Sequence, residues 1–189
     1  MMEFLHPDWF GGRENKWNEI LSKFKNKSDL RFLEIGTYEG RSAIWLLENI
    51  LTKKTSKLIC VDSWDGLEKE YTNFVNNIQV YKDKVIIRKG YSGIELRKIK
   101  SQIDFVYIDG SHTAKDVLED SILVWRLLKI GGILIWDDYL WDAPRTKGII
   151  TNRPQIAIES FLQMWIGEYR ILHKELDVNI GTWIAIEKI

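Results

Sequence analysis

The sequence predicts an α/β protein built on a doubly wound, mostly parallel sheet. Short, continuously apolar runs alternate with helical patterns along most of the chain. Continuous hydrophobicity is typical of strands that are covered on both faces, and strand–helix–strand repetition implies right-handed crossovers. The chain has 189 residues and no repeat, low-complexity stretch or linker. We therefore expect a single domain.

The elements follow from these runs in order. A helix is expected at 17–24, after an N-terminal arm, and parallel strands at 31–35, 57–61, 85–88, 103–108 and 132–136. Apolar residues at helical spacing predict helices at 41–50 and 113–128. The second of these helices should stop at Lys129, before Gly131 and Gly132.

The last forty residues follow a different pattern. A helix is expected at 155–165, followed by strands at 169–172 and 182–186. The stretch between these strands is too short for a crossover helix, so they should form an antiparallel hairpin at the sheet edge. The whole would be a Rossmann-like sheet of seven strands. We divide the chain into an arm and helix (1–28), a core (29–139), a loop (140–154) and a C-terminal helix and hairpin (155–189).

Composition excludes several classes of protein. Lys plus Arg and Asp plus Glu are both 27, so no broad basic surface for nucleic acid is expected. No apolar run reaches the roughly 20 residues of a membrane helix, and residues 1–9 lack the order of a signal peptide. The single cysteine, Cys60, has no internal disulfide partner. We therefore expect a cytoplasmic protein with neither nucleic-acid nor membrane partners; the oligomeric state stays open, a homo-oligomer included.

Eight of the nine tryptophans divide into two groups. One group lies in predicted helices or strands and should fill the core; it comprises Trp45, Trp125, Trp136, Trp165 and Trp183. The other group, Trp9, Trp64 and Trp141, falls in loops or at strand ends. In a doubly wound sheet, ligands bind at the carboxyl ends of the strands. The second group is therefore expected around a binding cleft.

The first strand ends in a glycine loop that predicts close approach to a ligand. Gly36 and Gly40 let the backbone pass near a bound molecule, and Glu34 suits a cationic ligand better than a pyrophosphate. The spacing also differs from the dinucleotide fingerprint, which disfavours an NAD-dependent oxidoreductase. At the next strand end, Asp62 can grip both ribose hydroxyls and Trp64 can stack on a base. Each acid alone could equally be a helix cap.

Together these motifs resemble the class I S-adenosylmethionine-dependent methyltransferases. They are Glu34-x-Gly36-x-x-x-Gly40-x-Ser42, Asp62, Ile108-Asp-Gly-Ser-His112 and Gly131-Gly-x-x-x-x-Asp-Asp138-Tyr. The chain is most similar to the branch of small-molecule O-methyltransferases that includes macrolide-sugar and aminocoumarin enzymes. The resemblance covers about residues 31–139, and the terminal hairpin also fits the seven-stranded sheet of that family.

The resemblance implies a role for each matched residue. The glycine loop would approach the methionine part of the cofactor, Ser42 its carboxylate, Glu34 its cationic end and Asp62 its ribose. Relatives commonly carry Gly-Asp-Ser near the adenine where this chain has Gly90-Tyr91-Ser92, so the base contact could pass to backbone groups or Ser92. The expected cofactor residues are Glu34, Gly36, Thr37, Tyr38, Gly40, Ser42, Asp62, Ser63, Trp64, Gly90, Tyr91, Ser92 and Asp109.

Three carboxylates follow the fourth and fifth strands and suggest a metal site. Asp109, Asp137 and Asp138 should face one cleft, where they would repel one another without a cation. Oxygen donors of this kind suit Mg²⁺, Mn²⁺ or Ca²⁺, and members of the resembling branch bind a metal with acids at these positions. Because adjacent strand residues point in opposite directions, Asp137 and Asp138 can share an ion only if the chain bends there. The alternative is that both are structural.

The expected chemistry is methyl transfer to a hydroxyl group. A divalent cation can chelate two neighbouring hydroxyls and lower the pKa of the attacking one. His112, with Asp109 beside it, is the candidate general base; a structural histidine is the equal alternative. The acceptor would be a sugar or another small vicinal diol, with a substrate wall drawn from Trp9, Tyr139, Trp141 and Arg145. The alternatives are a metal-independent small-molecule methyltransferase and an inactive cofactor-binding or interaction domain.

Overall fold

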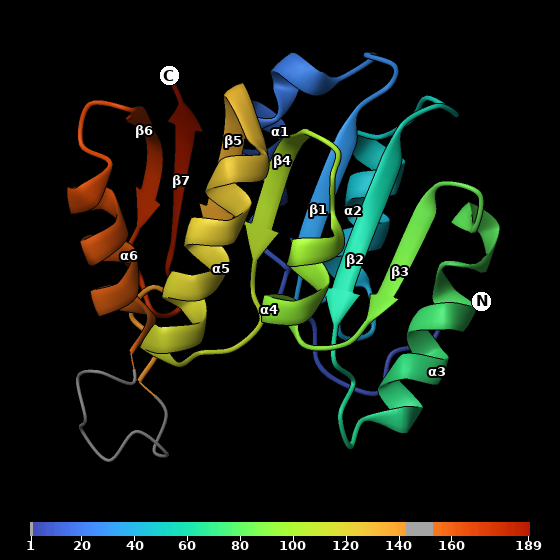
Figure 1. Ribbon diagram of the computed structural model, residues 1–189. Helices are drawn as coiled ribbons and strands as arrows, with labels where there is room; N and C mark the ends of the chain where they lie inside the picture. The colour runs from blue at the N-terminus through green and yellow to red at the C-terminus, as the bar shows by residue number, and fades with distance from the viewer. Residues whose placement is uncertain (1, 143–152) are drawn as a thin grey trace.

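The sheet has the doubly wound order that the sequence predicts. The computed structural model describes residues 2–142 and 153–189. Their seven strands form one sheet in the order β3-β2-β1-β4-β5-β7-β6 (Figure 1). The order reverses between β1 and β4, and ligands bind near such a switch point in doubly wound sheets. The carboxyl ends of the parallel strands meet at the lower edge of the sheet in Figure 1.

The strands confirm the predicted parallel core and antiparallel hairpin. The first five strands pair in parallel, and β7 runs antiparallel to both β5 and β6. The strands are β1 (Arg31–Ile35), β2 (Lys57–Asp62), β3 (Val85–Lys89), β4 (Ile103–Ile108), β5 (Leu128–Trp136), β6 (Tyr169–Glu175) and β7 (Trp183–Lys188).

Helices cover both faces of this sheet. In Figure 1, α4, α5 and α6 lie in front of the sheet, and α1 and α2 lie behind it. The core is accordingly divided into two hydrophobic clusters, one on each face, to which β1, β2, β4 and β5 contribute alternate residues. The helices are α1 (Glu14–Ile20), α2 (Arg41–Asn49), α3 (Glu68–Asn77), α4 (Ser92–Glu95), α5 (Ala114–Leu127) and α6 (Pro154–Met164).

Several elements differ from the sequence prediction. The helix expected at 17–24 is divided into α1 and a 3-10 turn at Ser22–Phe24. The helix expected to reach Lys129 ends at Leu127, because the backbone turns extended at Leu128 and enters β5 directly. The sequence analysis identified neither α3 nor α4; α3 is mostly polar and buries only Phe74 and Asn77, so its apolar pattern is weak.

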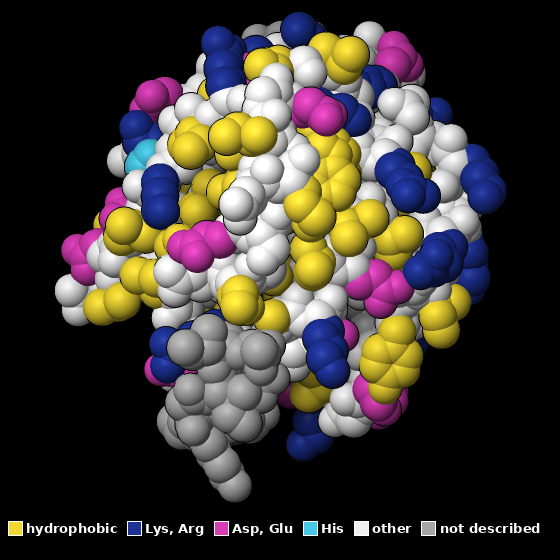
Figure 2. Space-filling model, turned by 60° about the vertical axis from the view of Figure 1, so that its left-hand side comes forward, with side chains coloured by type: hydrophobic (Ala, Val, Ile, Leu, Met, Phe, Trp, Pro, Cys, Tyr) yellow, Lys and Arg dark blue, Asp and Glu magenta, His cyan; other side chains and the backbone are white. Residues whose placement is uncertain are grey.

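The surface mixes apolar and charged side chains. The face brought forward in Figure 2 shows hydrophobic side chains among Lys/Arg and Asp/Glu side chains of both signs. Exposed apolar residues include Met164, Ile166 and Ile171, near the β6 edge. In the parts of the chain that the structure describes, no helix combines the length and apolar character needed to cross a bilayer.

Candidate active site

A cavity of about 1430 Å³ opens at the carboxyl ends of the parallel strands. Its walls come from the N-terminal arm, the loops that follow β1, β2, β3, β4 and β5, and the turn between β6 and β7. Small-molecule sites usually span roughly 300–1,000 Å³. The cavity is therefore large enough for a nucleoside cofactor together with an acceptor.

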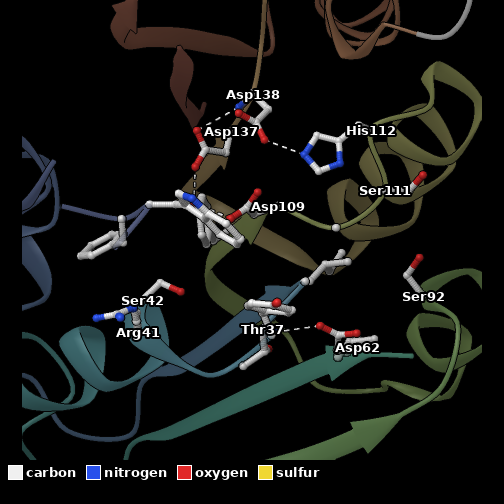
Figure 3. A pocket seen from close by; sticks show the side chains of 18 of the residues that line it. Thr37, Arg41, Ser42, Asp62, Ser92, Asp109, Ser111, His112, Asp137 and Asp138 are labelled. Atoms are coloured by element: carbon white, nitrogen blue, oxygen red, sulfur yellow. Dashed lines mark hydrogen bonds and ion pairs between the residues drawn. The ribbon is translucent and has the colours of Figure 1, made fainter. Parts of the chain in front are cut away.

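The loop after β1 needs glycine for steric reasons. Gly36 has φ +86°, and a Cβ added there would lie 1.9 Å from the backbone oxygen of Asp109. A side chain at Gly40, which also has φ +86°, would meet the ring of Phe74 at 2.8 Å. Both glycines line the cavity, as do Thr37 and Ser42 (Figure 3). The loop thus brings its backbone to the cavity wall, as the sequence predicted.

Glu34 does not lie where the sequence analysis placed it. Its side chain is fully buried beneath the loop, does not line the cavity, and accepts a hydrogen bond from the Ser42 hydroxyl. Burial raises the pKa of Glu34 to about 8, although Ser42 and Thr37 act in the opposite direction. At neutral pH the group is therefore mostly neutral, so it does not hold a cation directly. It acts instead by positioning Ser42.

Asp62 lines the cavity at the end of β2 and also fixes the neighbouring loops. Its Oδ2 accepts the backbone N–H of Tyr38 at 2.8 Å, and its Oδ1 accepts that of Trp64 at 2.9 Å. A carboxylate oxygen has further acceptor capacity, so these bonds leave Asp62 able to receive ribose hydroxyls. Ser63 lines the cavity beside it.

The expectation that Trp64 stacks on a base is wrong. Its side chain is fully buried between Tyr71 and Phe74, outside the cavity wall, and its Nε1 donates to Tyr38 O at 2.8 Å. The residue adopts φ +45°, which turns the chain so that the indole enters the core. The loop after β3 does line the cavity through Gly90, Tyr91 and Ser92.

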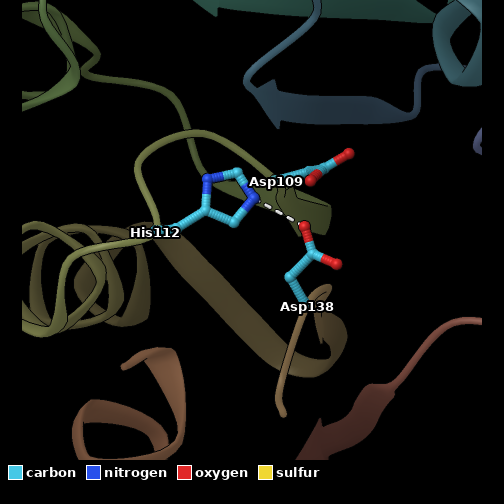
Figure 4. A group of neighbouring side chains, drawn as sticks. All are labelled: Asp109, His112 and Asp138. Atoms are coloured by element: carbon cyan, nitrogen blue, oxygen red, sulfur yellow. Dashed lines mark hydrogen bonds and ion pairs between the residues drawn. The ribbon is translucent and has the colours of Figure 1, made fainter. Parts of the chain in front are cut away.

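Three polar side chains from the loops after β4 and β5 meet in the cavity. Ligand atoms of Asp109, His112 and Asp138 all lie within 4.8 Å of one another (Figure 4). His112 Nε2 is 2.5 Å from Asp138 Oδ2. Burial and the charges of Asp137 and Asp138 raise the pKa of Asp109 well above its ordinary value, although Arg13 and Tyr107 oppose this rise. A cation at this point would relieve the repulsion among the carboxylates.

Asp137, the third predicted metal ligand, belongs to a different network. Its Oδ1 accepts a hydrogen bond from Arg13 Nη2 at 2.9 Å, and its Oδ2 accepts one from the Tyr107 hydroxyl. Both members of the Arg13–Asp137 ion pair are buried. Burial raises the pKa of Asp137, and Arg13 partly offsets that effect. The carboxylate is thus already neutralised from within the protein.

The backbone explains why the two adjacent acids separate. Strand residues alternate between faces, and Asp137 continues the face that carries Tyr107 and the N-terminal helix. Asp138 adopts φ +54°, in the left-handed region, and this turn directs its side chain to His112. The chain therefore bends at this point, as the sequence analysis required for a shared ion. The bend instead places Asp137 against Arg13 and Tyr107, and Asp138 against His112.

The N-terminal arm forms one wall of the cavity. Glu39 holds the arm by accepting the backbone N–H groups of Leu5 (2.8 Å) and His6 (3.2 Å). The rings of His6, Trp9 and Tyr38 form a cluster with centroids 5.2–5.8 Å apart. All three line the cavity, and Trp9 is 62% exposed. The arm therefore presents an aromatic surface to the cavity.

Not all of the residues predicted to form the substrate wall line the cavity. Trp141 lines the cavity and packs on His112, with ring centroids 4.3 Å apart. Tyr139, in contrast, is only 2% exposed and donates its hydroxyl to Glu159 at 2.6 Å, away from the cavity. The assignment of Tyr139 to substrate is therefore wrong. Arg145 lies outside the described residues.

Several residues at the site escaped the sequence analysis. Tyr107 was detectable, because it lies two residues before Asp109 and so shares its strand face. Arg13 gave no signal, since it reaches Asp137 from 124 positions away in the chain. Asp120, buried in α5, lines the cavity as well. His6, on the N-terminal arm, also contributes to the wall.

Comparison with known proteins identifies the family. A family model described as a methyltransferase domain matches residues 33–139. The chain belongs to this methyltransferase family. The resemblance to class I S-adenosylmethionine-dependent methyltransferases inferred from the motifs is thereby confirmed at the level of the family.

Similar proteins and solved structures agree with this result. The chain is 29% identical over 147 residues to uncharacterized protein R132 of Acanthamoeba polyphaga mimivirus, an alignment that covers 72% of this chain and 65% of that protein. An O-methyltransferase from Bacillus cereus, solved with SAH, is 18% identical to this chain, with a TM-score of 0.70. The match covers 97% of the present chain and 82% of the Bacillus chain. An rRNA methylase from Streptococcus thermophilus is 11% identical (TM-score 0.66; 99% of each chain). These structures share the fold.

Proposed function

We propose that this methyltransferase transfers the methyl group of S-adenosylmethionine to a hydroxyl of a sugar or another small vicinal diol, with the help of a divalent metal. One observation carries the proposal: Asp109, His112 and Asp138 converge in the same cavity as the glycine loop and Asp62. The cavity thus combines a place for the cofactor with a group of proton acceptors.

The cofactor fits the cavity in one direction. Ser42 lies on one side of the site, Ser92 lies on the other, and Thr37 and Asp62 lie between them (Figure 3). The methionine part would lie along the glycine loop, the ribose at Asp62, and the base beyond it toward Ser92. This arrangement leaves the reactive centre near Asp109, where the acceptor would enter.

The donor set fits a hard divalent cation. Asp109 and Asp138 would hold the ion, and Mg²⁺ or Mn²⁺ would keep the rest of its shell for water and acceptor oxygens. We leave Asp137 out of this proposed set, because Arg13 already pairs with its buried carboxylate. When bound, the cation would chelate two neighbouring hydroxyls and make one of them a better nucleophile.

The protein's own residues supply the remaining steps. With the Nε2–H of His112 donating to Asp138 Oδ2 at 2.5 Å, Nδ1 would accept the proton of the attacking hydroxyl, and the carboxylate would stabilise the imidazolium that forms. Trp141 packs on the imidazole ring and limits its rotation. Alignment of the hydroxyl with the methyl group contributes much of the remaining acceleration.

The acceptor class rests on the shape and chemistry of the wall. Trp9 and Trp141 offer apolar faces and the acidic group offers hydrogen-bond acceptors, a combination that suits a polyol. The charges of both signs on the face in Figure 2 give no support to a large nucleic acid acceptor.

Substitution of Asp138 tests the proposal. We expect Asp138→Ala to reduce turnover by at least about 10²-fold, because it removes a metal ligand and the partner of the general base. Binding of S-adenosylhomocysteine, measured by calorimetry, should stay close to that of the wild-type protein. The matched control is Asp83→Ala, at an exposed acid that precedes the amino end of β3. It should change neither turnover nor cofactor binding. Loss of cofactor binding in Asp138→Ala, or unchanged turnover, would contradict the assignment.

A further inference from the structure

The edge of the sheet opposite the cavity carries a strongly basic surface, which we call the basic edge. It comprises the segments that lead into the five parallel strands, residues 25–31, 52–57, 79–84, 99–102 and 126–131. These segments hold eleven of the 27 basic residues of the chain but only two of its 27 acids, Asp29 and Asp83. Several Lys and Arg side chains line the upper rim of Figure 2, which corresponds to this edge. The basic residues are Lys25, Lys27, Arg31, Lys53, Lys54, Lys57, Lys82, Lys84, Lys100, Arg126 and Lys129.

The positive charges of the basic edge are largely not neutralised within the protein. In the part of the chain that the structure describes, Lys129 is the one member of the eleven with an ion pair, to Asp104 at 2.7 Å. Burial and the charge of Lys57 lower the pKa of Lys84, so neighbouring lysines repel one another here. Eight of the eleven residues are exposed. A surface of this kind attracts anions.

The sheet arranges these charges in a row. The five segments lead into β3, β2, β1, β4 and β5, which are neighbours in that order. Adjacent strands lie about 4.8 Å apart, so the row extends over about 20 Å. The cavity with its carboxylates opens at the other ends of the same strands. The row therefore lies at the edge remote from the proposed chemistry.

Exposed aliphatic side chains accompany the lysines. Among the described residues, the three most exposed large hydrophobic side chains are Ile130 (80%), Ile166 (79%) and Val80 (76%). Val80 precedes β3, and Ile130 lies at the start of β5. Ile166 precedes β6, which begins beside the end of β7 and hence near the start of β5. Aliphatic side chains among lysines suit adsorption to a membrane, where apolar burial adds to attraction by anionic headgroups.

The composition of the edge favours a lipid surface over a nucleic acid. Nine of its eleven basic residues are lysines, whereas arginine is preferred for bidentate recognition of nucleic acids. Proteins commonly hold single strands by stacking bases on aromatic rings. The exposed aromatic side chains of the described residues, Trp9 and Tyr91, line the cavity at the opposite edge. The basic edge thus offers charge and aliphatic surface without an exposed aromatic platform for bases.

We propose that the basic edge docks this methyltransferase reversibly on an anionic phospholipid surface, with its lysines at the headgroups and Val80, Ile130 and Ile166 at the interface. The parallel strands have five or more residues, so about 16 Å or more of strand separates this edge from the cavity. The cavity would then open away from the lipid. The proposal departs from the expectation of no membrane partner, since that expectation considered only segments that cross a bilayer or direct export.

Co-sedimentation with lipid vesicles tests the proposal. We expect the wild-type protein to bind vesicles of phosphatidylcholine and phosphatidylserine at least about 10-fold more tightly than vesicles of phosphatidylcholine alone. Raising NaCl from about 0.1 M to about 0.5 M should remove most of this preference, because salt screens exposed charges. Lys53→Glu/Lys54→Glu should lower binding to the anionic vesicles by at least about 10-fold. Should this variant fail to fold, as judged by circular dichroism, Lys25→Glu/Lys27→Glu makes the same change in the loop before β1.

Two further variants separate charge, position and apolar contact. Lys69→Glu/Lys115→Glu makes the same change in net charge at exposed lysines near the amino ends of α3 and α5, at the cavity edge. This matched control should bind the anionic vesicles as the wild-type protein does. Ile130→Ser should weaken that binding by about 3-fold or more, because it removes an aliphatic side chain from the interface.

The outcomes that overturn the proposal are distinct from a failure of the methyl-transfer assay. Equal binding to the two kinds of vesicle, or no binding to the anionic ones, overturns it without any variant. Undiminished binding of a folded Lys53→Glu/Lys54→Glu protein does so too, as does an equal loss in the matched control. Binding of a labelled single-stranded RNA through Lys53 and Lys54, without binding to vesicles, would assign the edge to nucleic acid instead.

Discussion

The side chain of Arg13 determines which acids remain available for chemistry. It neutralises Asp137 inside the protein, while Tyr107 lies between Asp137 and Asp109, 3.0 Å from Asp109 Oδ2. Burial disfavours the charge of Arg13, but the surrounding acids, chiefly Asp137, outweigh it and raise the pKa of the guanidinium. Arg13 thus pairs with Asp137 and leaves Asp109 and Asp138 to face His112.

Removing Arg13 should therefore be costly. We expect Arg13→Met to lower the free energy of unfolding by about 3–5 kcal/mol, because Asp137 would remain as an uncompensated buried charge. Much of this loss should return in the double variant Arg13→Met/Asp137→Leu. Urea denaturation of the two variants gives both values. A loss below about 1 kcal/mol for the single variant would show that the pair contributes little.

Glu34 gives a pH-dependent signature at the same scale. The pKa of Glu34 is about 8 in the folded protein, against an ordinary value of 4.5. Between these values the folded protein keeps a proton that the unfolded chain has lost, so stability falls as pH rises from about 4.5 through about 8. The loss would be at most about 5 kcal/mol.

The variant Glu34→Gln should remove this part of the pH dependence. Thermal unfolding measured from pH 5 to pH 9 should show a flatter profile for the variant than for the wild-type protein. Gln keeps a hydrogen-bonding partner for Ser42 but carries no titrating proton. Parallel profiles for the two proteins would contradict the raised pKa.

At the scale of elements, the glycine loop after β1 depends on its contact with the strand end of β4. Asp109 N donates to Ile35 O at 2.8 Å, which joins the end of β4 to the end of β1, and Gly36 N donates to Val61 O of β2 at 2.9 Å. The absence of a side chain at Gly36 permits this approach. The cofactor wall and the acidic end of the cavity are therefore mechanically connected.

Substitution of this glycine should affect both loops. Gly36→Ala places a methyl group 1.9 Å from the Asp109 carbonyl oxygen, whereas Gly131→Ala shares the positive φ (+75°) but meets no atom within 4 Å. Both variants carry the cost of a left-handed backbone, about 1–2 kcal/mol. We expect Gly36→Ala to lose several kcal/mol more and to abolish S-adenosylhomocysteine binding. Equal destabilisation of the two variants in urea would contradict the steric argument.

The predictability of the fold follows from the same elements. Strands such as β1 and β4 were identified with correct bounds because a strand buried on both faces must be continuously apolar. The helix α3 was missed because it buries little and its sequence is mostly polar. The predicted start of β5, residue 132, was too late. The prediction assumed that the glycines at 131 and 132 separate helix from strand, whereas α5 ends at Leu127 and β5 begins at Leu128.

The site was predictable wherever topology alone brings residues together. Asp62, Asp109 and Asp138 follow parallel strands, and the carboxyl ends of such strands must lie on one edge. The error at Asp137 came from a partner, Arg13, that only tertiary structure brings near. Trp64 was misplaced for a related reason, since an indole at a strand end can turn either toward the cleft or into the core, and here a positive φ turns it inward.

For the molecule as a whole, zero net charge conceals an uneven distribution. The chain carries 27 basic and 27 acidic residues, yet carboxyl groups gather in one cavity, where Asp109, Asp138 and Asp62 lie in the wall. Such a cavity favours a cationic sulfonium and a divalent ion over an anionic polymer. The two faces of the sheet are packed with apolar side chains, so the chemistry is confined to one edge.

The central claim is that this edge transfers a methyl group to a hydroxyl with the help of a divalent cation. The most direct test incubates the protein with S-adenosylmethionine and a panel of sugars and catechols, and measures S-adenosylhomocysteine and methylated product by mass spectrometry. We predict acceptor-dependent product that chelator abolishes and Mg²⁺ or Mn²⁺ restores. Full activity in chelator would contradict the metal role, and cofactor binding without product from any hydroxylated acceptor would contradict the claim itself.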